Sequence, residues 1–179
     1  RPAAGRGTLG DMNHTPAAIP DASSRPGSSS PAGGHVRPDW DTYFLAIAEA
    51  VSRRSPDPST KHGCVLVDAG RRVVATGYNG PVAGLPNGMV PLERPAKYDW
   101  LIHAEDNAVA FARCDLRGST AYVTGPPCAA CFRRLLQVGV RRIVHAGRMS
   151  ACINPAEEAA CRAMAEALGV AVVAMDPEA

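Results

Sequence analysis

The stretch "STAYVTGPPCAACFRRLLQVGVRRIVHA", residues 119–146, carries the pattern that decides the fold. Residues 119–124 form a short run with β-branched and aromatic side chains, and residues 141–146 form a second apolar run. Between them, apolar positions recur over 128–139 at the spacing of a helix. A strand, a helix and a strand in this order predict two parallel neighbouring strands joined by a crossover helix.

Upstream of this unit lie two more β-branched runs, "GCVLVD" (63–68) and "RRVVATGY" (71–78), joined at "AG", which predicts a hairpin. The hairpin and the later strand–helix alternation together predict an α/β fold, a three-layer α-β-α sandwich around a five-stranded mixed sheet. Asp39 or Asp41 is placed to cap the first helix, and "NGPVAGLPNGMVPLERP" (79–95) is a long loop of the kind that carries function. The expected helices are 39–54, 103–114, 128–139 and 155–169, and the expected strands are 63–68, 71–78, 119–124, 141–146 and 170–175.

Residues 1–36 are dominated by Gly, Pro, Ser and Ala, as in "SSRPGSSSPAGG". Such a composition buries too little apolar surface to offset the entropy of ordering, so we expect a flexible tail followed by one folded domain over 37–179. The alternative reading of the tail is an arm that docks on a neighbouring molecule.

The charge balance is mild, with 19 Lys and Arg against 17 Asp and Glu, a formal net charge of +2. A long nucleic-acid footprint normally needs a strongly basic patch, so we expect no nucleic-acid partner, whereas a small anionic ligand needs only one or two cations. The longest apolar runs, such as "VAVVAM", fall far short of the ~18–20 residues of a membrane span. No basic segment leads into an apolar core at the N-terminus, so we expect no secretory signal. Six cysteines then fit a reducing, cytoplasmic setting. In that setting a Cys pair more often binds a metal or takes part in catalysis than forms a structural disulfide.

Two short motifs fall at the starts of consecutive expected helices, "HAEDNA" (103–108) and "PCAAC" (127–131). Cys128 and Cys131 are three residues apart and share a helix face, and a helix N-terminus favours thiolate over thiol. With the imidazole of His103 they make a Cys₂His set, and zinc sites with three protein ligands are catalytic, since the fourth position is left for water. Glu105 lies two residues after His103, placed to move a proton without binding the metal.

Other readings of these motifs stay open. A Cys-x-x-Cys alone can be a thioredoxin-like redox pair, but that reading leaves the His103–Glu105 motif unexplained. A zinc-stabilised interaction domain would account for the ligands but has no use for Glu105. Outside the motifs, simpler roles are expected for three groups: structural histidines at His62 and His145; core residues at Cys64, Cys114, Cys152 and Cys161; and a solvated or subunit-facing surface at Arg133–Arg134 and Arg141–Arg142.

An H-x-E motif followed by P-C-x-x-C is the signature of zinc nucleobase deaminases. The wider pattern resembles the deoxycytidylate (dCMP) deaminases of the cytidine deaminase superfamily, from about Tyr43 to Ala146. The zinc motifs are shared across that superfamily. The segments that point to the dCMP deaminases within that superfamily are "DPSTKHGCVLVD" (57–68), "GYNG" (77–80) and "KYDWLIHAEDNA" (97–108).

The resemblance implies the cytidine deaminase fold and a hydrolytic deamination of dCMP to dUMP with release of ammonia. Zn²⁺ would be held by His103, Cys128 and Cys131, with Glu105 as the proton shuttle. The resemblance also implies a homo-oligomer, a dimer or a hexamer, activated by dCTP and inhibited by dTTP through the loop after GYNG.

The resemblance implies four substrate-binding positions as well. Asn79 would contact the sugar, the backbone at Ala104 would help to hold the pyrimidine ring, and Thr60 and Lys61 would approach the 5′ end. If the two strands of the hairpin pair, their far ends converge and bring Thr60 and Lys61 close to Asn79.

Three departures from the family pattern stand out: Asp106 occupies an apolar position of HAExNA, the 79–95 loop lacks an extra Cys/His set, and the helix after HAE reads "FARC" (111–114), without the arginine of regulated members clearly in register. The competing functions are a polynucleotide deaminase of the tRNA adenosine type and a deaminase of a free or modified cytosine nucleoside or nucleotide in secondary metabolism. Activity on an oligonucleotide would favour the first, and activity on deoxycytidine without phosphate would favour the second.

Overall fold

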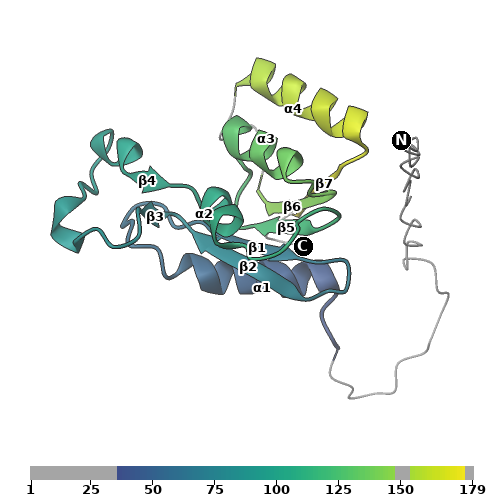
Figure 1. Cartoon of the computed structure of the whole chain (residues 1–179), viewed down its shortest axis with the longest axis horizontal. Helices are drawn as coiled ribbons and strands as arrows, with labels where there is room; N and C mark the ends of the chain where they lie inside the picture. The colour runs from purple at the N-terminus through teal and green to yellow at the C-terminus, as the bar shows by residue number, and fades with distance from the viewer. Residues whose placement is uncertain (1–35, 148–153, 176–179) are drawn as a thin grey trace, which may run out of the picture. The chain divides into compact units, whose positions relative to one another are not determined.

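A computed structural model describes residues 36–147 and 154–175, so the expected tail lies outside the described residues except for Val36. Five strands form one mixed sheet in the order β2-β1-β5-β6-β7 (Figure 1). β1 is antiparallel to β2 and β5, whereas β5–β6 and β6–β7 are parallel, as the hairpin and the alternation predict. The strands are β1 (Gly63–Val67), β2 (Val73–Tyr78), β5 (Thr120–Val123), β6 (Arg142–Ala146) and β7 (Ala171–Met175).

Helices cover both faces of the sheet and make three layers (Figure 1). The helices are α1 (Trp40–Ser52), α2 (Ala104–Phe111), α3 (Ala129–Gln137) and α4 (Pro155–Leu168). Alternate residues of β1 face opposite layers: Val65 packs with Phe44 and Ala48 of α1, whereas Leu66 packs in the cluster that contains Phe132 of α3. β1 is therefore buried on both faces, whereas β7 at the edge of the sheet is largely exposed. Among the described residues, no helix combines the length and the apolarity needed to cross a membrane.

The helix starts are fixed by side-chain caps. The Asp39 carboxylate accepts two backbone N–H bonds from the first turn of α1, each 2.9 Å long, so Asp39 is the cap. Asp41 instead pairs with Arg142 of β6, with two N–O distances of 2.6 Å. At α4, Asn154 and Glu157 form a reciprocal capping box.

The segment between β2 and α2 is more organised than the expected loop. β3 (Gly80–Pro81) pairs with β4 (Leu101–Ile102) in a small two-stranded sheet, and between them lie the 3₁₀ turns η1 (Asn87–Met89) and η2 (Ala96–Asp99). This arm extends from the end of the main sheet (Figure 1). Two-residue strands are too short to leave a periodic pattern in a sequence.

Two expectations about the region after α2 are wrong. The helix ends at Phe111 rather than at residue 114, because Ala112 turns to an extended conformation with ψ 134° and starts the return to β5. Cys114 therefore lies beyond the helix and is exposed, not part of the core. Cys64 and Cys161 are buried as expected, and Cys152 lies outside the described residues.

Candidate active site

The start of α2 lies directly against β2, and Gly77 of the "GYNG" segment makes this approach possible. A Cβ at residue 77 would lie 2.2 Å from the Ala104 carbonyl oxygen and 2.3 Å from the Ala108 nitrogen. Asn107 adds a hydrogen bond of 2.8 Å from its side-chain amide to the carbonyl of Tyr78. A larger residue at position 77 would push α2, with His103 and Glu105 at its start, away from the sheet.

His103, Cys128 and Cys131 converge from two helix starts. His103 is the N-cap residue of α2, and Cys128 is the N-cap residue of α3. The ligand atoms of the three residues all lie within 4.8 Å of one another, and His103 Nδ1 is 3.5 Å from Cys128 Sγ and 3.3 Å from Cys131 Sγ. A nitrogen and a sulfur that share a tetrahedral zinc ion are separated by roughly 3.5 Å, given Zn–N and Zn–S bonds of about 2.0 and 2.3 Å. The three residues therefore fit Zn²⁺ bound through Nδ1 and two sulfurs.

The three side chains of the cluster shift one another's pKa values. Hydrogen bonds to its sulfur from Cys131 and His103 lower the pKa of Cys128 to about 3, and the hydrogen bond that its own thiol makes to Cys128 raises the pKa of Cys131. The Cys128 sulfur in turn raises the pKa of His103 to about 8. The lowered pKa favours the thiolate at Cys128, which is the form of cysteine that binds metal, whereas His103 must lose its proton before Nδ1 can bind a metal.

Glu105 is buried beside the cluster, with 5% of its surface exposed. Burial raises the pKa of its carboxyl group to about 7, against an ordinary value near 4.5. A carboxyl group with a pKa near neutrality is suited both to accept and to donate a proton. This is the environment expected of a general acid–base group.

Asp106, the departure from the family pattern, faces α3. Its Oδ1 lies 2.7 Å from Arg134 Nε, close enough for an ion pair, although the N–H is not aligned for a hydrogen bond. The pair joins the two helices that carry the metal cluster, so it helps to set their separation.

Two of the four arginines expected on a solvated surface, Arg134 and Arg142, thus pair with acidic residues of the same chain.

A cavity of about 390 Å³ opens beside the cluster and is continued by a smaller one of about 200 Å³. The larger cavity is lined by His62, Asn79, Arg94, Tyr98, His103, Ala104, Glu105, Pro126 and Cys128. The smaller cavity shares five of these residues and adds Asp57, Thr60, Lys97 and Leu101. A separate cavity of about 490 Å³ beside Arg53 and Arg54 has no His, Cys, Asp or Glu in its lining, so the chemistry belongs to the first two.

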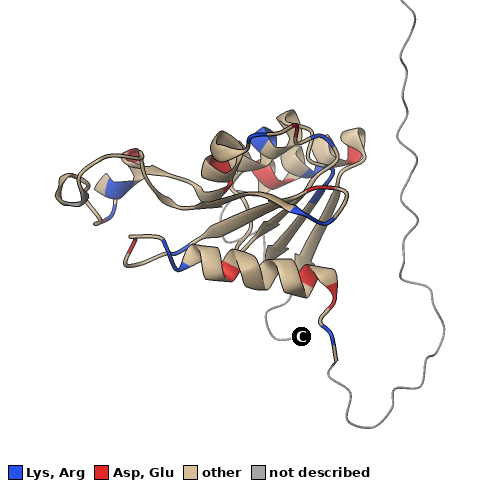
Figure 2. Cartoon of the chain, turned by 60° about the horizontal axis from the view of Figure 1, so that its bottom comes forward, with Lys and Arg blue, Asp and Glu red and all other residues tan. Residues whose placement is uncertain are grey.

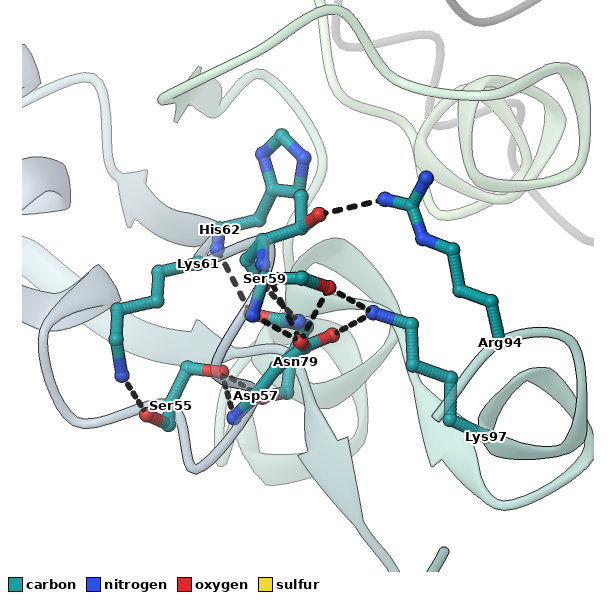
Figure 3. Close-up of polar contacts among 9 residues, drawn as sticks. Ser55, Asp57, Ser59, Lys61, His62, Asn79, Arg94 and Lys97 are labelled. Atoms are coloured by element: carbon teal, nitrogen blue, oxygen red, sulfur yellow. Dashed lines mark hydrogen bonds and ion pairs between the residues drawn. The ribbon is translucent and has the colours of Figure 1, made fainter. Parts of the chain in front are cut away.

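Asn79 is brought to Thr60, as the hairpin geometry predicts. Its side-chain Nδ2 donates to the Thr60 carbonyl at 2.8 Å, and its Oδ1 accepts from the His62 N–H at 2.7 Å (Figure 3). Asn79 therefore holds the 60–62 segment in place at the edge of the cavity. Lys61 is directed elsewhere: its ammonium donates to the Ser55 carbonyl (Figure 3), and Lys61 is not among the residues that line either cavity.

The floor of the smaller cavity is tied by a buried ion pair. Lys97 Nζ lies 2.6 Å from Asp57 Oδ2 and 2.6 Å from Ser59 Oγ, and both charged side chains are 2% exposed (Figure 3). The contact joins the "DPSTK" and "KY" segments, which are 40 residues apart. It anchors η2, which carries Tyr98, against the segment that carries Thr60.

Sequence reasoning assigned no site role to three polar side chains that line the larger cavity: His62, Arg94 and Tyr98. His62 was expected to be structural, but its ring lies in the cavity wall, where a Cβ at Gly125 would come within 2.7 Å of it. Burial, followed by the nearby His103, lowers the pKa of His62. His62 directly precedes the first strand, next to the "DPSTK" segment, and that position was the available signal. His145 is buried in β6 with Nδ1 3.3 Å from the Ala146 carbonyl, as expected of a structural histidine.

Residues 38–147, which include the whole cluster and its cavity, match the family model described as the cytidine and deoxycytidylate deaminase zinc-binding region. The deoxycytidylate deaminase of Mycobacterium phage D29 is 42% identical over 123 residues, which cover 61% of this chain and 95% of the phage protein. The deoxycytidylate deaminase of Mus musculus is 33% identical over 113 residues, which cover 59% of this chain and 64% of the mouse protein.

A solved structure supports the same relationship. The crystal structure of the dCMP deaminase from the cyanophage S-TIM5, in complex with dCMP and dUMP, superposes with a TM-score of 0.63 at 25% identity. The superposition covers 79% of this chain and 100% of the phage chain.

Proposed function

The chain belongs to the cytidine and deoxycytidylate deaminase zinc-binding family, and we propose on that premise that it hydrolyses dCMP to dUMP and ammonia. The observation that carries the proposal is the placement of a buried Glu105 beside a Cys₂His cluster at the wall of one cavity. His103, Cys128 and Cys131 would hold the zinc. Zinc supplies the Lewis-acid chemistry that makes water a nucleophile near neutral pH.

Glu105 moves the protons of the reaction. Its carboxylate accepts a proton from the water that attacks C4 of the cytosine ring, and it delivers a proton to N3. It then accepts the remaining proton, from the new C4 hydroxyl, and passes it to the exocyclic amine. The C4–N bond breaks, ammonia leaves, and the oxygen of the water becomes the 4-carbonyl of the uracil product. No oxidant or second substrate is needed for this balance.

The rest of the cavity orients the nucleotide. Asn79 and the backbone at Ala104 lie in the wall that Glu105 shares, and we assign them to the sugar and to the pyrimidine ring. Fixing the ring against Glu105 converts the attack into a step between pre-positioned groups, which lowers the entropic part of the barrier. Two hydrogen bonds to the 60–62 segment fix the Asn79 amide in this wall.

Ammonia release measured across a substrate panel tests the proposal. The panel comprises dCMP, CMP, deoxycytidine and a single-stranded oligonucleotide, each incubated with zinc-loaded protein. We expect dCMP to give the highest kcat/KM. A highest value for deoxycytidine or for the oligonucleotide would replace the proposal with the nucleoside or the polynucleotide alternative. Acidic and basic positions are interspersed over the described helices (Figure 2), which gives the polynucleotide alternative no support.

We extend the proposal to assembly and setting. The family resemblance supports a homo-oligomer, a dimer or a hexamer, and the cysteine content supports a cytoplasmic protein. Light scattering on the purified full chain measures the molar mass in solution. A mass of one chain, near 18.7 kDa, would contradict the oligomer.

A further inference from the structure

Three cationic side chains come from the segments around the cavity: Lys61, Arg94 and Lys97. They differ in how many of their N–H groups already donate hydrogen bonds within the protein. Lys97 is buried and its ammonium is committed to Asp57 and Ser59, each at 2.6 Å. Lys61 donates to the Ser55 carbonyl and lines neither cavity. Lys97 is therefore neutralised by Asp57, whereas Lys61 keeps its charge but is directed away from both cavities.

Arg94 is in the opposite situation. It lines both cavities, is exposed, and forms no ion pair with a carboxylate of the described residues. Its one hydrogen bond to the described part of the chain runs from Nη2 to Thr60 Oγ1 at 3.0 Å, whereas a guanidinium has five N–H donors. Figure 3 shows the guanidinium reaching from the Lys97 side of the site toward the segment that ends at His62.

Thr60 is oriented to assist. Its backbone N–H donates to Asp57 Oδ1 at 3.2 Å, and its carbonyl accepts from Asn79, so the residue is held at both ends. Because its hydroxyl oxygen accepts from Arg94, the hydroxyl proton remains to be donated outward. Arg94 and Thr60 thus present N–H and O–H donors side by side.

The charges that line the cavity also favour an anionic group of a ligand beside Arg94. Its two carboxyl groups are Asp57, which Lys97 neutralises, and Glu105, which lies at the metal end. Of the Lys and Arg side chains that line the two cavities, Arg94 is left without a carboxylate partner among the described residues. A ligand that places its reacting ring against Glu105 would meet Arg94 with its far end, and a guanidinium pairs most strongly with a phosphate or a carboxylate.

We infer that Arg94, supported by the Thr60 hydroxyl, binds the 5′-phosphate of the nucleotide and determines the preference for nucleotide over nucleoside. This inference rests on the proposed function, and it assigns to Arg94 the role that the family resemblance gives to Lys61. Charge-assisted hydrogen bonds of this kind are worth about 1.5–3 kcal/mol, or about ten- to a hundredfold in affinity.

Calorimetric titration with dUMP and with deoxyuridine tests the inference on the zinc-loaded full chain. The unmodified protein should bind dUMP at least about tenfold more tightly than deoxyuridine. Arg94→Gln should lose most of this preference while its affinity for deoxyuridine stays within about threefold, and Arg94→Lys, which keeps the charge but loses the fork, should retain part of it. Arg113→Gln, at an exposed arginine beyond α2, is the matched control and should keep the preference. Zinc content and melting temperature confirm that each variant is folded.

Lys61→Gln separates the two assignments. A loss of preference greater in Arg94→Gln than in Lys61→Gln supports the inference. An equal or greater loss in Lys61→Gln, an unchanged preference in Arg94→Gln, or no preference in the unmodified protein would overturn it. Ammonia release from dCMP is measured in parallel: protein that binds dUMP through Arg94 yet releases no ammonia would refute the proposed function and leave the Arg94 assignment standing.

Discussion

Replacing Lys97 with methionine should destabilise the protein strongly, because it leaves a buried carboxylate without its cation. Asp57 Oδ1 would keep three hydrogen bonds, from the Ser59 N–H, the Ser59 hydroxyl and the Thr60 N–H, at 2.9, 3.0 and 3.2 Å. Oδ2 has Lys97 as its partner among the described residues. Methionine preserves much of the apolar stem of lysine, so the loss is chiefly electrostatic.

The expected cost is about 3–5 kcal/mol, the range observed when one member of a buried ion pair is removed. A free-energy loss of this size lowers the melting temperature of a domain of this size by roughly 10 °C. Removing both charges should restore much of the stability, since Asp57→Asn leaves no charge to be buried alone. The double variant Asp57→Asn/Lys97→Met is therefore expected to melt above Lys97→Met.

The contribution of the Lys97–Asp57 pair to the free energy of unfolding depends on pH, and the direction follows from the pKa of Asp57. Burial raises the pKa of Asp57, but hydrogen bonds from Lys97, Ser59 and Thr60 outweigh it, so the pKa lies below its ordinary value. A depressed pKa adds stability above the unfolded-state pKa, near 3.9, and that stability is lost as the pH falls through the folded-state pKa. The stability gap between the unmodified protein and Lys97→Met should therefore be full at neutral pH and shrink below about pH 4.

Urea unfolding at pH 7, followed by circular dichroism, measures these differences. Arg162→Met provides the matched control, because Arg162 pairs with Glu158 on the exposed face of α4 at 2.8 Å with its side chain 75% exposed. That surface pair should cost at most about 1 kcal/mol. If Lys97→Met proves no more destabilising than Arg162→Met, the buried pair does not hold the floor of the cavity as argued.

Three further outcomes are expected. Cys131→Ala should remove most of the single zinc equivalent per chain, measured by metal analysis, and full occupancy would contradict the ligand assignment. Arg134→Leu should weaken zinc binding in a chelator competition by up to about tenfold, because the Asp106 pair between α2 and α3 is lost, while Arg133→Leu should not, and equal effects would refute the positioning role. A chain that begins at Val36 should keep its turnover of dCMP, whereas a large loss would mean that residues 1–35 complete the oligomer or the site.

The sheet could be predicted because its signals are local. The hairpin of β1 and β2 and the parallel units around α3 follow from runs of apolar residues and their spacing, and the cap at Asp39 directly precedes the helix that it starts. The convergence of His103 with the Cys pair was predictable for a related reason. Each motif sits at a helix start, and the crossover geometry brings such starts to the same edge of the sheet.

The remainder of the site depends on contacts between distant segments. The Lys97–Asp57 pair spans 40 residues and the Arg94–Thr60 contact spans 34, and no periodicity encodes either of them. Lys61 illustrates the converse case. Its position in the DPSTK motif predicts that it approaches the ligand, but in the structure its side chain donates to the Ser55 carbonyl. The end of α2 at Phe111 depends on where the chain must turn to enter β5, which its helical residues do not reveal.

The rate of dUMP formation from dCMP, measured at equal zinc content for the unmodified protein and for Glu105→Gln, tests the central claim most directly. The amide cannot shuttle a proton, so the variant should bind zinc and unfold like the unmodified protein while its kcat falls by at least about a hundredfold. One ammonia should appear for each dUMP in the unmodified protein. A zinc-loaded protein that forms no dUMP, or a Glu105→Gln variant with near-normal kcat, would contradict the account.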